Sequence, residues 1–485
     1  MAAPKQFHVR TYGCQMNAHD SEKIANLLYH AGYRECSSAD AADVLIVNTC
    51  SIRDKAEHQL YSDLGVLRSW KQAEPDRVLA VAGCVAQQQG DAIQRRFPHV
   101  DFVFGTHNLR LVPSMLAGAR RGLRSLATDE SSSLERFDLP ARHPDYDGAT
   151  PGRAYLTVME GCDLFCSFCI VPTTRGREIS RPAPPIVAEA EALAARGVRE
   201  LTLLGQTVNA YGRHDLRRGR GAPRGTLGFG ALLRRLAQIP GIDRLRYTSP
   251  HPSFFDADLI RAHGELTALC PHVHLPVQSG SDRVLERMRR RYTCDDFRRL
   301  VDALREARPD IAITSDLIVG FPGETDADFR ATLALVREVA FVDSFSFKYS
   351  PRPGTPAASM DAVVSADLAQ ARLNELQDLQ RELTLAAHRA RVGGLTEVLV
   401  EGGSRRGGGQ LSGRDPYHRV VNFETRALPT LPAPGDLLDV RIVEATPHSL
   451  IGECLVERWP DTMGSAVKPA SGFADEKERS AVLGR

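Results

Sequence analysis

Long hydrophobic runs, a leader-like start and an excess of either charge are all missing from this sequence. No apolar stretch approaches the roughly 18 residues that a membrane-spanning helix needs, so we expect no contact with a membrane. The opening residues, MAAPKQFHVR, contain no basic segment followed by an apolar one, so we expect no secretion signal and a cytoplasmic location. The formal net charge is only +1, so any surface that binds nucleic acid must be a local basic patch.

The composition is typical of a globular α/β protein with more than one core. The chain has 485 residues, of which 42% are hydrophobic and 25% charged. This length predicts roughly three domains. In a cytoplasmic protein the ten cysteines are expected to be free thiols or metal ligands, because disulfides form mainly in oxidising compartments.

Three kinds of pattern follow one another along the chain. Apolar strand-like runs such as DVLIVNT and RVLAVAG alternate with helical segments, which predicts an N-terminal βαβ sheet domain with parallel strands. Six further strand and helix units, beginning at AYLTVME, predict a partial or full (β/α) barrel. Short strands joined by glycine-rich turns then predict a small all-β barrel of the OB type. The expected ranges are 5–125 for the sheet domain, 126–150 for a polar linker, 151–385 for the (β/α) barrel, 386–458 for the small barrel and 459–485 for a disordered tail.

Three cysteines without a fourth ligand follow the first strand of the predicted (β/α) barrel. The stretch GCDLFCSFC places Cys162, Cys166 and Cys169 in a CxxxCxxC spacing, at the barrel end where such folds build active sites. Three thiolates can bind three irons of a 4Fe-4S cluster, which leaves the fourth iron open to a small molecule. The alternative is a zinc knuckle or a redox pair, but a tetrahedral zinc site needs a fourth ligand, and SFCIVPTTRG supplies no further one.

A second set of three cysteines follows strands of the N-terminal domain. The stretches TYGC, VNTC and VAGC end in Cys14, Cys50 and Cys84. Because the carboxyl ends of parallel strands share one edge of a sheet, these thiols are expected to converge there. Each cysteine alone could be a small buried residue of the core. Their three equivalent positions favour a second iron-sulfur cluster, again with one iron open.

These motifs resemble those of known enzymes. The CxxxCxxC spacing with Phe168 before the last cysteine is similar to that of the radical S-adenosylmethionine superfamily. That resemblance implies that the cofactor chelates the open iron and is cleaved to methionine and a 5′-deoxyadenosyl radical. Together, the three predicted domains resemble the radical SAM methylthiotransferase family over residues 5–458. The resemblance implies two 4Fe-4S clusters: a sulfur-donating cluster on the N-terminal cysteines, and a radical cluster with S-adenosylmethionine on the barrel cysteines.

Smaller signatures indicate the branch of that family. The stretches TYGCQMN and NTCSIRDKAE resemble the branch that methylthiolates carbon 2 of isopentenyladenosine next to the anticodon of tRNA. Other branches act on threonylcarbamoyladenosine in tRNA, or on an aspartate of a ribosomal protein, where the first cysteine lies in GCPKN. The stretch PTTRG departs from the branch, which usually has tyrosine at the position of Thr173.

The resemblance also implies partners. These are a tRNA anticodon stem-loop, a one-electron reductant such as a flavodoxin and a supply of sulfide or iron-sulfur units, with the enzyme itself a monomer. The last barrel resembles the TRAM domain, and its composition suits phosphates and base stacking. The residues concerned are Arg405, Arg406, Arg414, Tyr417, His418, Arg419 and Phe423.

Several features have weaker interpretations. Arg175 and Arg177 could meet a carboxylate or a phosphate, or lie on a solvated surface. The strand-end stretches LLGQTVNAYG, HLPVQSGS and DLIVGFPGET suit an adenosyl or methionyl group, or are ordinary turns. The non-enzymatic alternative is an iron-sulfur RNA-binding or electron-transfer protein, although an electron carrier gains nothing from an open iron. The remaining cysteines have no partner spacing and are expected to be structural: Cys36, Cys270, Cys294 and Cys454.

Overall fold

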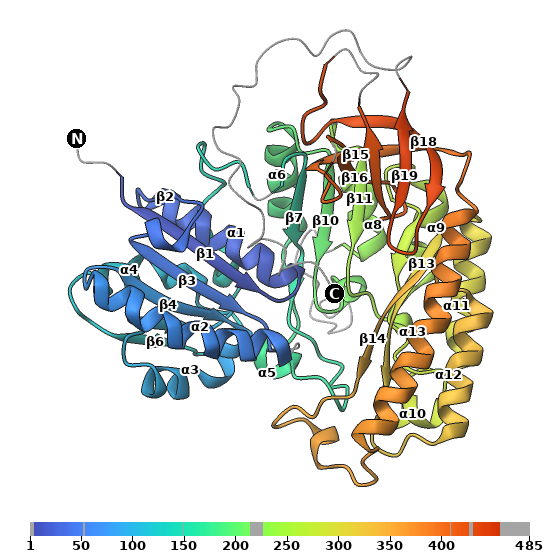
Figure 1. The fold of residues 1–485 in the computed structure, drawn as a ribbon, viewed down its shortest axis with the longest axis horizontal. Coiled ribbons are helices and arrows are strands. Elements are labelled where there is room, and N and C mark those ends of the chain that lie inside the picture. Colours follow the sequence, from blue (N-terminus) through green and yellow to red (C-terminus); the bar gives the residue numbers. More distant parts are fainter. Residues whose placement is uncertain are drawn as a thin grey trace.

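The computed structural model describes residues 4–51, 54–148, 150–213, 227–407, 409–425 and 430–455. Its helices and strands form three bodies that pack against one another (Figure 1). The expected tail at 459–485 lies outside these ranges. Within them, no helix is both long enough and apolar enough to span a bilayer.

A six-stranded parallel sheet forms the N-terminal body, with the strand order β2-β1-β3-β4-β5-β6. All residues of β3 and β4 are buried, because α1 and α4 cover one face of the sheet and α2 and α3 cover the other. Tyr146, within the expected linker, packs its ring on that of Tyr29 in α1. The elements are β1 (Gln6–Tyr12), α1 (Gln15–His30), β2 (Arg34–Glu35), β3 (Val44–Thr49), α2 (Asp54–Ala73), β4 (Val78–Gly83), α3 (Cys84–Arg96), β5 (Phe102–Phe104), α4 (Val112–Ala119) and β6 (Ser125–Ala127).

The second body is a partial barrel of six parallel strands. Two three-stranded sheets, β11-β10-β7 and β12-β13-β14, are joined by a parallel bridge between Leu245 and Leu269. Helices pack on the outside of the strands around one large apolar core. The six strands of the partial barrel are β7 (Arg153–Thr157), β10 (Glu200–Leu204), β11 (Arg244–Tyr247), β12 (His272–His274), β13 (Ala312–Val319) and β14 (Asp343–Lys348). A separate antiparallel pair consists of β8 (Met159–Glu160) and β9 (Ile179–Ser180). The helices are α5 (Val171–Arg175), α6 (Ala183–Ala194), α8 (Phe229–Leu236), α9 (Ala257–Glu265), α10 (Asp282–Arg287), α11 (Cys294–Ala307), α12 (Asp326–Val339) and α13 (Ala366–Arg389).

The third body is a closed five-stranded barrel, in the order β15-β16-β17-β19-β18. It lies across the amino ends of β7, β10 and β11 (Figure 1). Arg244, the first residue of β11, donates to the carbonyl oxygens of Arg414 (3.0 Å) and Glu397 (2.9 Å), and Arg246 donates to that of Asp415 (2.7 Å). The loop that carries Cys162, Cys166 and Cys169 lies beyond the carboxyl ends of β7 and β10. The small barrel and this cysteine loop therefore lie at opposite ends of the partial barrel. The strands are β15 (Leu395–Gly403), β16 (Leu411–Arg414), β17 (Val420–Glu424), β18 (Leu437–Ala445) and β19 (Leu450–Cys454).

Candidate iron-sulfur sites

The loop after β8 brings Cys162, Cys166 and Cys169 together. The first two are buried in one small apolar cluster, and Cys169 packs against it. The loop turns at Gly161, where φ is +80° and a Cβ would lie 2.0 Å from the carbonyl oxygen of Arg177, so only glycine fits. The Gly161 N–H donates to Oε1 of Gln206, which comes from the stretch LLGQTVNAYG and fixes the loop on the end of β10.

The same three thiols are held in a dry environment. Burial raises the pKa of Cys162, and burial with the nearby Cys166 raises that of Cys169 to about 12. The Cys162 thiol lies 3.1 Å from Oγ1 of Thr207, and Nη1 of Arg290 donates to Sγ of Cys166 at 3.6 Å. The Cys162 and Cys169 thiols are therefore protonated at neutral pH, and a metal that binds them must displace those protons.

The N-terminal cysteines lie at one edge of the parallel sheet, as predicted. Cys14 caps α1, Cys84 is the first residue of α3, and Cys50 directly follows β3, which lies between β1 and β4. At Gly13 a Cβ would lie only 2.4 Å from Cβ of Cys50, so the two chains approach closely there. A hydrogen bond with Cys50 lowers the pKa of Cys14 to about 6 against the effect of burial. The N-termini of α1 and α3 both lie at this edge of the sheet. Their positive dipole ends favour anionic sulfur there.

Within the described residues, no three His, Cys, Asp or Glu side chains meet around a point from which they could hold one metal ion. Each thiolate of a four-iron cluster binds a different iron, so the ligands of a cluster need not meet at one point. The donor set, three thiols and no carboxylate, is the set that an iron-sulfur cluster uses.

In the part of the chain that the structure describes, buried hydrogen-bonding groups without partners lie in residues next to both sets of cysteines. Beside Cys50 they are Oγ1 of Thr49 and Oγ of Ser51, and beside the barrel loop they include Nε2 of Gln206. Such groups are costly to bury unless a ligand pairs with them, and cluster sulfides or a cofactor carboxylate would accept their hydrogen bonds. The residues present therefore fit the expected clusters and S-adenosylmethionine.

The helix after the barrel loop connects the two sites. Within α5, Arg175 reaches across to Asp20 of α1 and donates to its Oδ2 at 2.5 Å, with both side chains only 3% exposed. Oγ1 of Thr106 also donates to the carbonyl oxygen of Thr174 (2.5 Å). The prediction that Arg175 could meet a carboxylate is confirmed, and Arg177 likewise donates to Asp163 (2.6 Å).

A second buried ion pair reinforces this contact and was missed from the sequence. Glu160 of β8 accepts from Nε of Arg136 (2.9 Å) and lies 3.6 Å from Nζ of Lys23 in α1. Burial alone would raise the pKa of Glu160, but the cations Lys23, Arg136 and Arg175 lower it to about 2. The sequence did contain one signal for this contact. Two charged residues, Asp20 and Lys23, lie three positions apart on the same face of α1 as the buried Ile24.

The other strand-end motifs have structural contacts. Gly280, from HLPVQSGS, packs so closely on α12 that a Cβ would lie 2.5 Å from Cα of Thr332. Glu324, from DLIVGFPGET, accepts from Nη1 of Arg372 in α13 (2.7 Å). Of the three motifs, the one ending β10 hydrogen-bonds to the cysteine loop, and Phe321 of DLIVGFPGET lies in an apolar cluster against which Phe168 of that loop packs.

The predicted RNA-binding residues of the small barrel divide into two groups. Arg405 and Arg406 are exposed in the turn between β15 and β16. In contrast, Nε of Arg414 lies 3.2 Å from Glu401, and the Tyr417 hydroxyl donates to Asp310 (2.7 Å) at the junction with the partial barrel. His418 stacks on His272, Arg419 lies over the Tyr417 ring, and Phe423 is 0% exposed in the core. The prediction that Phe423 could stack on RNA is wrong, because β17 turns that side chain inward.

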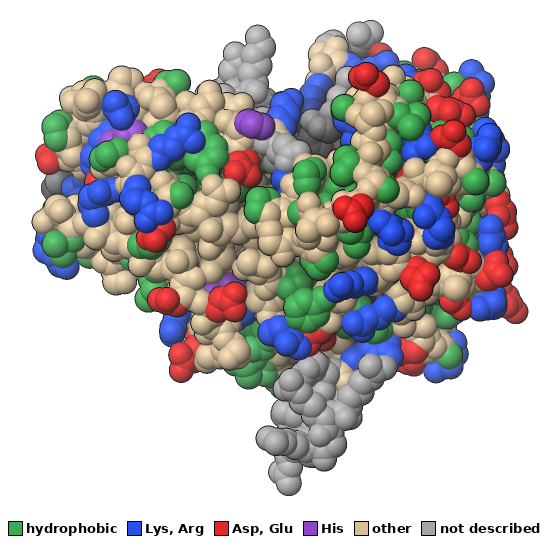
Figure 2. All heavy atoms as spheres, turned by 90° about the horizontal axis from the view of Figure 1, so that it is seen from below, with side chains coloured by type: hydrophobic (Ala, Val, Ile, Leu, Met, Phe, Trp, Pro, Cys, Tyr) green, Lys and Arg blue, Asp and Glu red, His purple; other side chains and the backbone are tan. Residues whose placement is uncertain are grey.

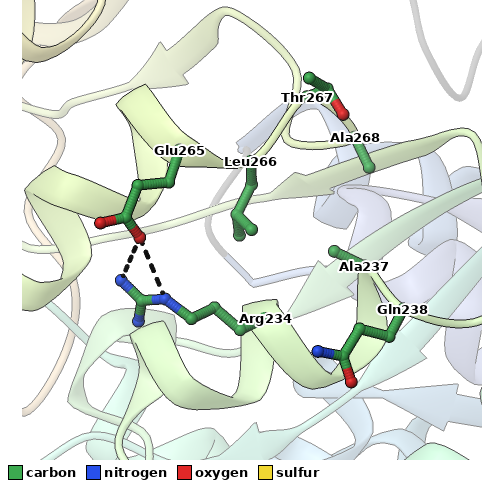
Figure 3. A pocket seen from close by; sticks show the side chains of 7 residues that line it. All are labelled: Arg234, Ala237, Gln238, Glu265, Leu266, Thr267 and Ala268. Atoms are coloured by element: carbon green, nitrogen blue, oxygen red, sulfur yellow. Dashed lines mark hydrogen bonds and ion pairs between the residues drawn. The ribbon is translucent and has the colours of Figure 1, made fainter.

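Two surface pockets lie on the partial barrel, and one of them adjoins the cysteine loop, because its lining residue Arg291 donates to the carbonyl oxygen of Leu164 (3.4 Å). A pocket of about 240 Å³ lies between α8 and α9, where Arg234 donates to Glu265 (Figure 3). A second, of about 260 Å³, is lined by Ser253, Arg291 and Tyr292 among others. On the face opposite the small barrel, basic and acidic side chains are interspersed (Figure 2). The surface in that view therefore has no continuous field of one sign.

Three family models match the chain in succession. They are the uncharacterized protein family UPF0004 at residues 6–105, the radical SAM superfamily at 156–336 and the TRAM domain at 389–455. Among solved structures, TsrM of Kitasatospora setae, a radical S-adenosylmethionine methyltransferase with tryptophan and a cofactor analogue bound, shares the fold. Its TM-score is 0.51 at 16% identity, covering 73% of this chain and 75% of that chain.

Several curated relatives match almost the whole chain, and all are named tRNA-2-methylthio-N(6)-dimethylallyladenosine synthase. The protein of Geobacter metallireducens is 48% identical over 94% of this chain and 100% of its own length. That of Cereibacter sphaeroides is 49% identical over 93% and 99%, and that of Acidithiobacillus ferrooxidans 47% identical over 92% and 97%. The chain therefore belongs to the family of tRNA-2-methylthio-N(6)-dimethylallyladenosine synthases, within the radical SAM superfamily.

Proposed function

We propose that the protein transfers a methylthio group to carbon 2 of N(6)-dimethylallyladenosine next to the anticodon in tRNA. The observation that carries the proposal is the presence of two three-cysteine sets on elements that face each other across one domain contact. An electron carrier gains nothing from two incompletely ligated sets, because complete ligation protects a cluster. The family membership supplies the substrate class.

The six cysteines divide between two 4Fe-4S clusters. Cys162, Cys166 and Cys169 would hold the radical cluster, and the N-terminal set would hold the sulfur-donating one. When bound, the radical cluster and S-adenosylmethionine supply the one-electron chemistry that can remove an unactivated hydrogen atom. The chain's own part is to exclude water: Cys162 and Cys166 are buried, and Gln206 and Thr207 fix the loop that carries them.

The arrangement of the domains constrains how tRNA would bind. The target base must leave the anticodon-loop stack to reach the cysteine end of the partial barrel. The small barrel lies at the other end, about 25 Å away if the eight residues of β13 mark the barrel height. An RNA that contacts both would therefore run along the outside of the barrel, with Arg405 and Arg406 on its phosphates.

The further partners follow from this chemistry. The reaction needs a one-electron reductant such as a flavodoxin and a source of sulfide to restore the donor cluster. We propose that the enzyme acts as a monomer in the cytoplasm.

Analysis of nucleosides in tRNA from cells that lack the protein tests the proposal. We expect the 2-methylthio derivative to be lost and N(6)-dimethylallyladenosine to accumulate. The wild-type gene should restore the product, whereas genes carrying Cys50→Ala or Cys166→Ala should not. An unchanged level of the 2-methylthio derivative in the deletion strain would refute the proposal.

A further inference from the structure

One guanidinium nitrogen is buried without a partner beside the N-terminal cysteines. Arg175 is 2% exposed, and its Nη2 donates to Asp20, but its Nη1 has no hydrogen-bond partner in the part of the chain that the structure describes. Arginine keeps its proton at all accessible pH values, so this N–H group cannot become neutral. A buried donor left unpaired costs about 1–3 kcal/mol, and more when it is charged.

The guanidinium of Arg175 lies close to two of the three thiols. Helix α5 packs against α3, whose first residue is Cys84. Burial raises the pKa of Cys84, and the charge of Arg175 acts against that increase. The same charge contributes to the lowered pKa of Cys14. The guanidinium therefore faces the site from the side of the partial barrel, whereas all three cysteines come from the sheet domain.

We propose that Arg175 completes the N-terminal cluster site, with its Nη1 donating a hydrogen bond to a cluster sulfide or to the Cys84 thiolate. This inference rests on the proposed function, which assigns Cys14, Cys50 and Cys84 to a four-iron cluster. The site is then shared: the sheet domain provides the ligands, and the partial barrel provides a cationic donor. Because α5 begins two residues after Cys169, the same short segment is tied to both cysteine sets.

A shared site has a measurable electrostatic consequence. A reduced cluster carries one more negative charge than an oxidised one, so a nearby cation and hydrogen-bond donor raise its reduction potential. If Arg175 served only to pair with Asp20 and hold the domains together, removing either partner would have the same effect. If it acts on the cluster, removing Asp20 leaves the cluster contact in place.

The test uses the full chain with Cys162, Cys166 and Cys169 replaced by alanine, so that the signal comes from the N-terminal cluster alone. After anaerobic reconstitution, iron content and an electron paramagnetic resonance redox titration are measured. Arg175→Gln should shift the midpoint potential to a lower value, and Arg175→Lys, which keeps the charge, should shift it less. The matched control is Arg177→Gln, two residues away, where the side chain is 65% exposed and pairs with Asp163; it should leave the potential unchanged.

The outcomes separate the possible failures. Asp20→Asn removes a negative charge near the site and should therefore not lower the potential. An equal lowering in Asp20→Asn and Arg175→Gln would show that Arg175 acts only as an interdomain ion pair. An unchanged potential in Arg175→Gln, or in Arg175→Met if the glutamine variant does not fold, would overturn the inference while leaving the proposed function intact. If the parent protein, which keeps Cys14, Cys50 and Cys84, holds no four-iron cluster, the assignment of these cysteines is wrong and the inference is refuted as well.

Discussion

Replacing Arg405 and Arg406 by glutamine should weaken tRNA binding and make it less dependent on salt. The structure exposes these two arginines in one turn of the small barrel, whereas Arg414 pairs with Glu401. Each phosphate contact contributes about 0.7 to 0.9 to the slope of log affinity against log salt concentration, so losing two contacts should lower that slope by roughly 1.4 to 1.8. Cleavage of S-adenosylmethionine without tRNA should not change, since the turn lies at the far end of the partial barrel.

Fluorescence anisotropy with a labelled anticodon stem-loop, measured over a tenfold range of potassium chloride, gives the slope directly. The matched control is Arg414→Gln, which removes an arginine from the same barrel but one already paired within the protein; its slope should stay near that of the wild type. A double variant with an unchanged slope, or an Arg414→Gln slope that falls by the same amount, would refute this assignment of the RNA-binding surface.

The remaining predictions concern the cysteines and acid stability. Cys166→Ala should abolish cofactor cleavage, whereas Cys50→Ala should abolish methylthiolation and leave some cleavage; equal loss of both activities in both variants, measured by chromatography, contradicts this division. Reconstituted protein should hold about eight irons, and the variant with Cys14, Cys50 and Cys84 all replaced should hold about four. An iron content that is the same in this variant as in the wild type would exclude a cluster at the N-terminal site. Burial lowers the pKa of His263 from 6.5 to about 4. As the pH falls from 6.5 to about 4, the unfolded state therefore binds a proton before the folded state does, and up to about 3 kcal/mol of stability is lost. Chemical unfolding of His263→Gln should show less of this loss, and an unchanged pH dependence excludes His263 as its source.

The strands and both cysteine sets were predictable because each rests on a local pattern. The runs VLIV and VLAVAG are apolar throughout, as is typical of strands buried on both faces, and β3 and β4, which contain them, are fully buried. Parallel strands then place Cys14, Cys50 and Cys84 at one edge without further information.

Contacts between distant segments were not predictable in this way. Arg175 and Asp20 lie 155 residues apart, and nothing local indicates that one completes the surroundings of the other. The docking of the small barrel on the amino ends of the (β/α) strands depends equally on long-range pairing, such as Arg244 with Glu397. The burial of Phe423 could have been predicted from the sequence. Alternate residues of a strand share a face, and Val421 lies on the same face as Phe423.

Parallel reactions with purified, reconstituted enzyme test the central claim most directly. Three substrates are offered: tRNA carrying N(6)-dimethylallyladenosine, tRNA carrying threonylcarbamoyladenosine, and the ribosomal protein with its target aspartate. The account predicts that mass spectrometry finds a methylthio group on the first substrate alone, at carbon 2 of the adenine. Methylthiolation of either of the other two without the first would contradict the proposed substrate.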